Sequence, residues 1–269
     1  MKVTVVTPSY NGMRYLDECI VSVKIQRSKN VDVEHMVVDG GSTDGTVEFA
    51  RERGCTVMTG KDEGIFDAIN KGSFAARGEL LGFLGCDDLL LPGALERVVQ
   101  AYEQSGRRWV VGGIRWLDGP GTSRGDLAAP PRWINVPMSA SLGWNCIMHM
   151  ATYVNADLFR ELEGFDKEMK YAGDYDFFLR ALGIEPFARI GRTLACFRRH
   201  GNNQSMACTP KHRAELEAVE SEFGPSGEWQ KQYYRYLLKV WLNITNPRWF
   251  ACKRVDSFRA TRSKLAFQD

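Results

Sequence analysis

Short apolar runs alternate with helical patterns along the first 104 residues, and this alternation restricts the possible folds more than any other feature. The runs are rich in β-branched and other apolar residues, which is typical of buried strands. The predicted strands are Lys2–Thr7, Val33–Val38, Cys55–Met58 and Leu80–Leu84. The predicted helices are residues 13–26, 46–53, 64–76 and 92–104, the third with Ile65, Ala68, Ile69 and Phe74 facing the core. Such alternation predicts an α/β fold with a mostly parallel sheet and helices on both faces.

The pattern is less regular beyond residue 104. The expected elements are strands at Trp109–Trp116 and Thr193–Arg198, further elements at Ala151–Leu162 and Tyr171–Leu182, and helices from Pro210 onward. Residues 117–146 are rich in Gly, Pro and Ser, which favours a functional loop or a partly disordered one. We predict one domain over residues 1–208, with halves at 1–104 and 105–208. A helical extension is predicted over residues 209–269.

Charge and cysteine content exclude several classes of protein. The net charge is +2 over 269 residues, so nothing indicates nucleic-acid binding. The seven cysteines form no C-x-x-C pair, which argues against a zinc site and favours a reducing cytoplasm. The start of the chain does not resemble a signal peptide, and no stretch approaches the ~18 apolar residues of a membrane span. We expect a cytoplasmic protein.

Two adjacent carboxylates, Asp87 and Asp88, directly follow the apolar run that ends at Cys86. Adjacent carboxylates repel each other unless they are solvated or offset by a cation. Mg²⁺ and Mn²⁺ prefer carboxylate oxygen and often take phosphate oxygens as further ligands. The pair predicts a metal–diphosphate site, and the alternative is a solvated loop that caps the next helix.

Polar loops follow the first two strands. After the first, Pro8, Tyr10 and Asn11 offer a rigid turn, a ring for stacking and a short amide. After the second, Asp39–Gly45 combines an acid with glycines that allow a close backbone approach. Both loops could also be simple turns. Because the carboxyl ends of parallel strands share one edge, we expect the loops to meet there.

Several motifs, taken in order, resemble the family 2 glycosyltransferases with the GT-A fold, over about residues 2–205. The matching segments are Thr7-Pro8-Ser9-Tyr10-Asn11, Asp39–Thr46, Asp62–Gly72, Gly85-Cys86-Asp87-Asp88, Gly164-Phe165-Asp166 and Gly173–Arg180. The resemblance implies a GT-A-type, Rossmann-like sheet and a nucleoside-diphosphate-sugar donor. It also implies a divalent cation, Mg²⁺ or Mn²⁺, and an inverting transfer.

The resemblance assigns roles to individual residues. Asp88 matches the metal-binding acid, and His200 is a second candidate metal ligand. Asp174 matches the catalytic base, with Asp176 as the fallback and a helix cap as the alternative interpretation. The implied donor-binding residues are Pro8, Tyr10, Asn11, Asp39, Asp62, Asp87 and Arg199. Asn202, Asn203 and Ser205 lie in a stretch that resembles the family's closing segment.

The sequence departs from the family pattern in three places. Gly40 stands where the family often has a second acid, which leaves the base of the donor open, with a UDP-sugar favoured over GDP- and dTDP-sugars. Cys86 replaces a small polar residue. His149 is followed by Met150 where relatives often have Gln, so its role is less defined.

The tail is basic and aromatic. Residues 228–264 contain nine Lys or Arg against two acids, and Trp229, Tyr233 and Tyr236 fall near helical spacing. Such a helix can lie in a membrane interface, pack on the domain or form a dimer contact. A peripheral membrane contact would suit a lipid-linked saccharide acceptor in surface polysaccharide synthesis.

Two alternatives remain open at this point. A nucleotidyltransferase also places acids and metal at a sheet edge, but the loop after the first strand lacks its basic, glycine-rich pattern. A non-catalytic sugar-nucleotide-binding protein would not need both Asp88 and Asp174.

Overall fold

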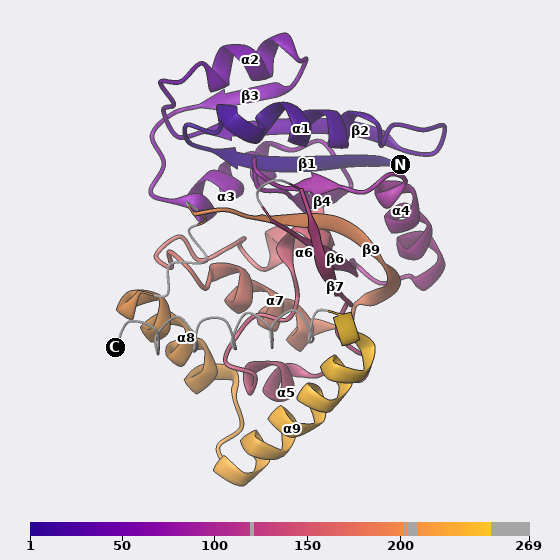
Figure 1. The fold of residues 1–269 in the computed structure, drawn as a ribbon, viewed down its shortest axis with the longest axis vertical. Coiled ribbons are helices and arrows are strands. Elements are labelled where there is room, and N and C mark those ends of the chain that lie inside the picture. The colour runs from indigo at the N-terminus through magenta and orange to yellow at the C-terminus, as the bar shows by residue number, and fades with distance from the viewer. Residues whose placement is uncertain (119–120, 202, 204–208, 249–269) are drawn as a thin grey trace, which may run out of the picture.

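A single mixed sheet flanked by helices forms the body of the molecule (Figure 1). The structure is a computed structural model that describes residues 1–118, 121–201, 203 and 209–248. Within these residues the sheet has nine strands in the order β3-β2-β1-β4-β8-β6-β9-β5, with β7 paired to β6. The α/β fold predicted from strand–helix alternation is confirmed.

The elements have the following bounds. The strands are β1 Lys2–Ser9, β2 Asp32–Asp39, β3 Thr56–Thr59, β4 Leu80–Phe83, β5 Leu89–Leu90, β6 Trp109–Asp118, β7 Ser123–Leu127, β8 Thr152–Asn155 and β9 Ala188–Arg199. The helices are α1 Met13–Lys24, α2 Thr46–Glu52, α3 Ile65–Ala75, α4 Ala94–Ser105, α5 Val136–Ala140, α6 Ala156–Glu161, α7 Gly173–Ile184, α8 Pro210–Phe223 and α9 Glu228–Thr245, with a 3-10 turn at His149–Ala151.

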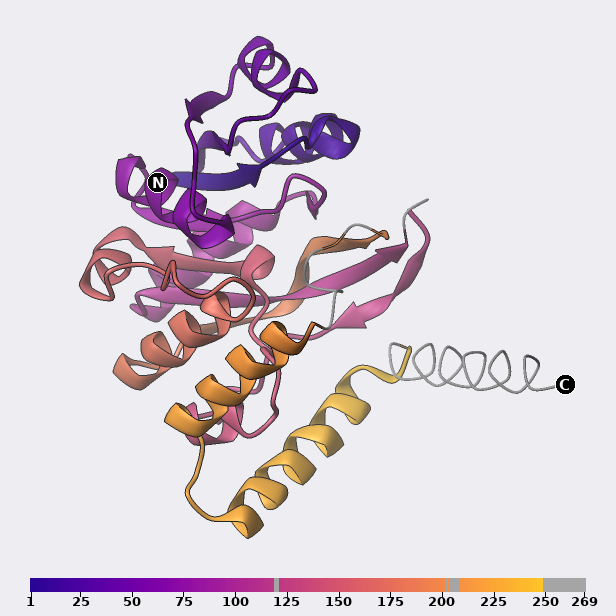
Figure 2. The same cartoon turned by 90° about the vertical axis from the view of Figure 1, so that its left-hand side faces the viewer.

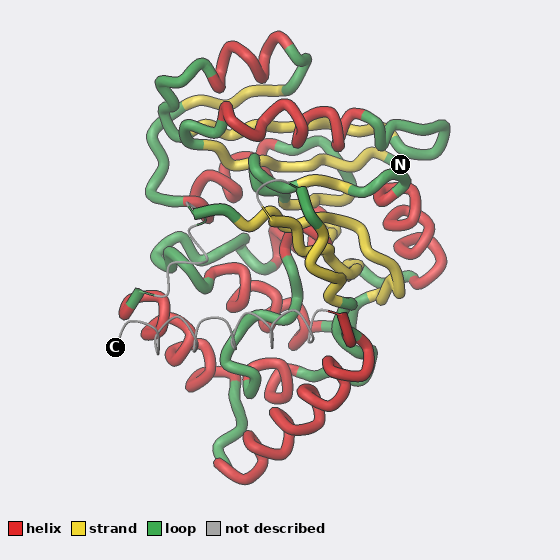
Figure 3. The backbone as a smooth tube through the Cα atoms, in the orientation of Figure 1, coloured by secondary structure: helices red, strands yellow, loops and turns green. Residues whose placement is uncertain are grey.

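The first half of the sheet is parallel and the second half is mixed. Strands β3, β2, β1 and β4 pair in parallel, as the sequence predicted. Strand β8 then joins β4 and β6 in antiparallel pairs, while β6 and β9 run parallel. In Figure 3 the strands form a layer between helices, and further helices gather below it.

Alternate residues of β2 show that helices cover both faces. Val37 packs with Leu16 of α1 and Ala50 of α2. The next residue, Val38, packs with Ala68 of α3 on the opposite face. Since side chains alternate along a strand, this buried run needs apolar cover on both sides.

Pro8 does not end β1, although the sequence analysis ended the strand at Thr7. The pairing with β2 continues to Ser9, whereas β4 pairs with β1 only from Val3 to Val6. Pro8 therefore lies beyond the stretch in which β1 has a partner on both sides. A proline without an N–H group is tolerated at such a position.

One core residue of α3 was predicted wrongly. Phe74 is about half exposed, at 49%, and Phe66 is buried instead. The ring of Phe66 stacks on Phe165, which belongs to the aromatic core of the second half. The helical period alone did not separate these two faces, because apolar residues occur on both.

The segment predicted as a loop at 117–146 carries two elements. Strand β7 pairs antiparallel with β6, and α5 is a short helix capped by Asn135. The Asn135 side chain accepts the N–H of Met138 at 3.0 Å. The prediction of a continuous loop is therefore wrong, because β6 gives β7 a partner that local periodicity does not reveal.

The predicted C-terminal helices are present and pack on the body. Val219 of α8 joins a cluster with Tyr175 and Leu179 of α7. Leu238 and Leu242 of α9 enter the two largest core clusters. Figure 2 shows α9 as the outer helix at the lower end of the molecule.

No described helix is long and apolar enough to cross a bilayer. The domain boundary at residue 208 stays a prediction.

A largely enclosed histidine of β2 makes stability depend on pH. His35 Nε2 lies 2.9 Å from Thr7 Oγ1, and burial lowers the His35 pKa from 6.5 to about 4. Because the folded pKa is below the unfolded one, the unfolded chain binds the extra proton more readily. The free energy of unfolding should therefore fall between pH 6.5 and 4, by up to about 3 kcal/mol. Urea unfolding at several pH values measures this loss. Equal pH slopes for wild type and His35→Gln would contradict it.

Candidate functional site

The loops after β1 and β2 are joined by hydrogen bonds at the carboxyl edge of the sheet. Asn11 N donates to Ser42 Oγ at 2.7 Å, and Asn11 Oδ1 accepts from Thr43 N at 3.0 Å. Met13 N donates to Asp44 Oδ2 at 3.1 Å, which ties the start of α1 to the same loop. Asn11 adopts a left-handed φ of 50°, a conformation in which Asn is enriched. Asn11 thus holds the two loops together.

Asp39 is fully buried and organises its own loop. Its Oδ1 accepts the N–H groups of Gly41 and Ser42 at 3.0 and 2.8 Å, and its Oδ2 accepts the Ser42 hydroxyl. In this arrangement the Asp39 carboxylate shapes the loop that would face a nucleoside. Direct contact with a base stays a prediction.

The Asp62 carboxylate occupies the space that a side chain at position 40 would take. A β-carbon on residue 40 would collide with Asp62 Oδ2, so glycine is needed for this approach. Asp62 Oδ1 accepts the N–H of Gly64 at 3.1 Å, which fixes the carboxylate. The Asp62 carboxylate, from the loop before α3, thus lies directly against the backbone of residue 40. Only the tertiary structure shows this contact.

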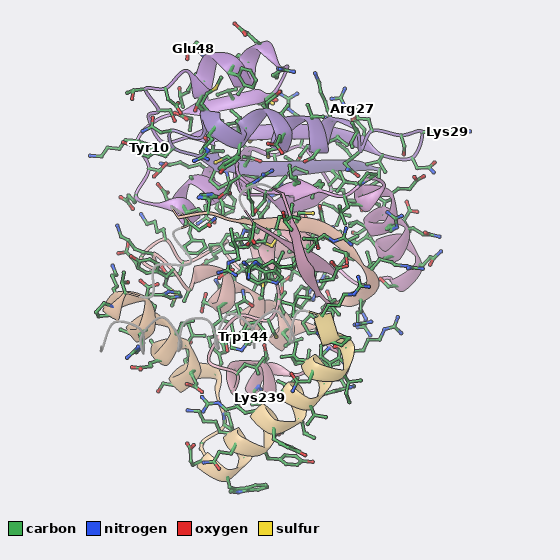
Figure 4. The ribbon with its side chains drawn as sticks, viewed as in Figure 1. Tyr10, Arg27, Lys29, Glu48, Trp144 and Lys239 are labelled. Carbon is green, nitrogen blue, oxygen red and sulfur yellow. The ribbon has the colours of Figure 1, made fainter. Side chains whose placement is uncertain are left out.

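Tyr10 is the exposed ring at this edge, with 69% of its surface accessible (Figure 4). It follows Pro8 and Ser9, the last residues of β1. The chain turns tightly at Gly12, where a β-carbon would lie 2.9 Å from Cys86 Sγ. Glycine therefore lets the Tyr10 loop lie against the segment that carries Asp87 and Asp88.

Pairing of β5 with β9 brings the two aspartates to His200. Arg198 N donates to Asp88 Oδ1 at 3.0 Å, and His200 Nε2 lies 2.8 Å from Asp87 Oδ2. Asn203 Nδ2 also donates to Asp87 Oδ2 at 3.2 Å. The aspartate pair, His200 and Asn203 therefore form one cluster across more than 100 residues of sequence.

Asp88 places a carboxyl group in a buried position. It is 2% exposed, and burial together with the Asp87 charge raises the pKa of its carboxyl to about 8. A cation bound there would offset the negative charge, so the carboxylate pair fits a divalent ion. No set of three ligating side chains occurs among the described residues. This fits an ion held by one or two carboxylates and completed by phosphate oxygens.

Arg198, near the end of β9, has a structural role. It is 4% exposed, and its Nη2 lies 2.6 Å from Glu18 Oε2. Its guanidinium lies over the ring of Tyr15, which also stacks on His200. The sequence reasoning missed Tyr15 and Glu18. Their spacing on one face of α1, next to the Tyr10 loop, was the available signal.

Arg199 ends β9 next to this cluster. It is half-buried, and its side chain makes no hydrogen bond or ion pair within the described part of the chain. Donor binding by Arg199 stays a prediction. Asn202 and Ser205, predicted in the closing segment, lie outside the described residues.

Asp174 faces His149 at the start of α7. Asp174 Oδ2 lies 3.5 Å from His149 Nδ1, and the Asp174 side chain is 21% exposed. Burial lowers the pKa of His149, but Asp174, Asp88 and Asp87 outweigh it and raise the pKa. The charges of all three carboxylates thus act on His149, and Asp174 is the one in contact with it.

Asp176, the fallback base, is engaged elsewhere. It is 6% exposed, and its Oδ2 lies 2.7 Å from Arg180 Nη2. Arg180 also donates to the carbonyl oxygens of Leu162 and Gly164. This pair ties α7 to the preceding turn, so its arrangement is structural.

The chain is similar in sequence to known glycosyltransferases. A family model described as Glycosyl transferase family 2 matches residues 4–153. An uncharacterized glycosyltransferase of Mycobacterium tuberculosis is 33% identical over 196 residues, covering 68% of this chain and 70% of that protein. Chondroitin synthase of Escherichia coli is 27% identical over 212 residues, covering 76% of this chain and 30% of that protein.

Solved structures share the fold. The crystal structure of S. aureus TarS 1–349 in complex with UDP-GlcNAc gives a TM-score of 0.66 at 20% identity, covering 87% of this chain and 70% of that chain. Mannosyltransferase PcManGT from Pyrobaculum calidifontis, in complex with GDP-Man and Mn²⁺, gives 0.61 at 18% identity, covering 98% and 80%. At these identities the likeness shows the fold, which is of the GT-A type.

Proposed function

This chain belongs to glycosyltransferase family 2, and we propose that it transfers a sugar, with inversion, from a nucleoside diphosphate to an acceptor hydroxyl. The observation that carries the proposal is the buried Asp87–Asp88 pair at the carboxyl edge of the sheet, together with Asp174 beside His149, whose pKa the charges of all three acids raise. The buried aspartate pair suits a cation and a diphosphate. Asp174, which lies beside His149, is suited to accept a proton.

In the proposed reaction the acceptor oxygen attacks the anomeric carbon opposite the diphosphate. The new carbon–oxygen bond forms as the bond to the phosphate oxygen breaks, and the diphosphate leaves with the electron pair. Asp174 takes the hydroxyl proton, because a sugar hydroxyl is too weak an acid to lose it unaided. His149 Nδ1 lies beside the Asp174 carboxylate and would orient it.

The donor would lie along the carboxyl edge of the sheet. Tyr10 offers an exposed ring for the base, and Pro8, Asn11, Asp39 and Asp62 shape the surrounding loops. Asp87 and Arg199 would lie next to the sugar and the phosphates of the donor. A UDP-sugar is the favoured donor.

A divalent cation, Mg²⁺ or Mn²⁺, is proposed as the cofactor. Asp88 would hold it, with Asp87 and His200 as neighbours. When bound, it would stabilise the charge that develops on the leaving diphosphate. His200 already contacts Asp87, so its part is to hold that carboxylate or to join the ion.

The two alternative functions are not favoured. A nucleotidyltransferase would need a phosphate-binding loop after β1, whereas that loop is committed to hydrogen bonds with the β2 loop. A non-catalytic sugar-nucleotide-binding protein would not need Asp174 beside His149 in addition to the aspartate pair.

A thermal-shift panel tests the proposed function. UDP, GDP and dTDP are each added with and without Mn²⁺, because a ligand that binds only the folded state raises the unfolding temperature. We expect stabilisation by one nucleotide, UDP first, only with metal. The matching nucleotide sugar should then release nucleoside diphosphate slowly to water. Pyrophosphate release from a triphosphate, without nucleoside diphosphate release, would contradict the proposal.

The acceptor is proposed to be a saccharide or a lipid-linked saccharide of surface polysaccharide synthesis, reached from the cytoplasmic face of a membrane. Helix α9 supports a peripheral contact. An aromatic and aliphatic stripe runs along it with helical spacing: Trp229, Tyr233, Tyr236, Val240 and Ile244, all exposed. We call these five residues the α9 stripe.

The body of the protein fixes the direction in which the α9 stripe faces. Leu238 and Leu242 on the opposite side are buried, and Arg235 Nη2 lies 2.6 Å from Glu220 Oε1. Asn246 Oδ1 accepts the N–H of Ala128 at 2.7 Å. Lys239 lies on the exposed part of α9 (Figure 4). Aromatic and basic residues on one helix suit the surface of an anionic bilayer. Residues 249–264 of the predicted membrane segment lie outside the described residues.

Removing the ends of the α9 stripe is expected to release the protein from membranes. Trp229→Glu with Ile244→Glu should lower partitioning onto vesicles with anionic phosphatidylglycerol at least tenfold, since a buried large apolar side chain contributes about 1.5–3 kcal/mol. Vesicle flotation of the full chain measures this. Trp133→Glu, which changes an exposed tryptophan outside α9, is the matched control. Unchanged flotation of the double variant would contradict the contact, and dimers on a sizing column would assign the stripe to a second copy.

A further inference from the structure

We infer that Glu215 of α8 is a positioning residue for the transfer reaction. Its carboxylate binds the backbone just before α7 and thereby fixes where Asp174 stands. The inference rests on the proposed function, because it concerns the placement of the proposed base. It also gives the C-terminal helices a part in the active site, although the sequence shows them only as an extension.

Three consecutive backbone N–H groups point at this carboxylate. Oε2 of Glu215 accepts from Lys170, Tyr171 and Ala172 at 3.1, 2.7 and 3.1 Å. Oε1 accepts from Lys170 at 3.0 Å. Helix α7 starts at Gly173, so Asp174 is only two residues beyond the last of these donors.

The contact lies just before α7, and no side chain caps the helix itself. The residue before α7 is Ala172, which has no side chain that could accept an N–H group. Within the described residues the Asp174 carboxylate accepts no backbone N–H either, and it pairs with His149. A negative charge near a helix N-terminus is favourable, and Glu215 supplies it from another helix. Asp174 is therefore left facing His149 rather than capping its own helix.

Helix α8 is held firmly enough to act as a support. Val219 is fully buried against Ala172 and Tyr175 of the α7 region. The ring of His212 stacks on Tyr171 at 5.1 Å between centroids. These contacts flank Glu215 along α8 and bind the same segment that its carboxylate holds.

Loss of the carboxylate should misplace the base without affecting the donor loops. The donor loops follow β1 and β2, and the aspartate pair follows β4. Within the described residues the hydrogen bonds of Glu215 all go to residues 170–172 and none goes to these loops. A displacement of about 1 Å in a reacting group can cost about 100-fold in rate. We therefore expect a defect in kcat and not in donor binding.

The test compares Glu215→Ala, Glu215→Gln and Glu217→Ala in the full chain. Glu217 is exposed on the same helix and serves as the matched control. The readouts are nucleoside diphosphate release from the nucleotide sugar, the KM for that donor, and hydrogen exchange of the amides at 170–172. Glu215→Ala is expected to lower kcat about 10- to 100-fold, with donor KM unchanged within twofold. Glu215→Gln keeps one acceptor oxygen and should recover part of the rate.

Each outcome separates this inference from the proposed function. Faster amide exchange at 170–172 together with the kcat loss supports the positioning role. A Glu215→Ala kcat within twofold of wild type overturns it, as does unchanged exchange. If Glu215→Ala lowers kcat and donor affinity together, and both losses match the fraction of unfolded protein, the inference is also overturned. A general loss of structure would then explain both effects. If wild type releases no nucleoside diphosphate, the proposed function fails, and the exchange result alone still shows whether Glu215 holds the segment.

Discussion

Asp174→Asn is expected to lower kcat for sugar transfer by about 10³- to 10⁴-fold, the upper range for loss of a general base. In barrier height this is about 4–5.5 kcal/mol. The amide cannot take the acceptor proton, but it is the same size and can remain beside His149. Donor binding should survive, because the donor loops lie on other elements. Nucleoside diphosphate release measures the rate, and the metal-dependent thermal shift with UDP measures binding.

The control for this prediction is Asp157→Asn. Asp157 is 84% exposed on α6 and pairs only with its neighbour Arg160. Its rate should match wild type. An Asp174→Asn variant that keeps more than a tenth of the wild-type kcat would place the base elsewhere. A variant that loses both rate and the UDP-dependent shift would indicate that Asp174 binds the donor.

Asp88→Asn is expected to abolish metal-dependent stabilisation by the donor nucleotide and to lower kcat/KM by about 10³-fold or more. The change removes the buried charge that would hold the cation. Asparagine keeps an oxygen that can accept the Arg198 N–H, so the fold at β5 and β9 should persist. Thermal shifts with Mn²⁺ and UDP, together with the release assay, measure both effects.

The stability of Asp88→Asn provides a second check. Burial raises the pKa of Asp88 to about 8, far above its unfolded value, so the folded protein gains stability when this carboxyl is protonated. This stabilisation is complete at pH values below the pKa of Asp88 in the unfolded chain, and it is lost as the pH rises through 8. Without metal at pH 8, the asparagine variant should therefore unfold at the same temperature as wild type or higher. Asp32→Asn, at the exposed start of β2, is the control. A lower unfolding temperature in metal-free Asp88→Asn would falsify the view that Asp88 carries an unfavourable buried charge.

Local patterns were enough to predict the first half of the fold. Buried strands such as Leu80–Leu84 are apolar on both faces, so they stand out as continuous runs. The following loops were placed at one edge by chain direction alone, and the structure joins them through Asn11 and Ser42. The irregular second half was predicted less well, because β7 depends on its partner β6 rather than on its own composition.

The sequence by itself indicated the glycosyltransferase family of this protein and the residues now proposed for its site, because the aspartate pair, Asp174 and the polar loops stand in an order that resembles the family. Only the tertiary structure decided what each of them contacts. Pairing of β5 with β9 joined Asp87 to His200, and Gly40 made room for Asp62. Packing of α8 brought Glu215 to the segment before Asp174. These contacts link residues far apart in the chain, and their geometry follows from sheet order and helix packing, which local sequence patterns do not specify.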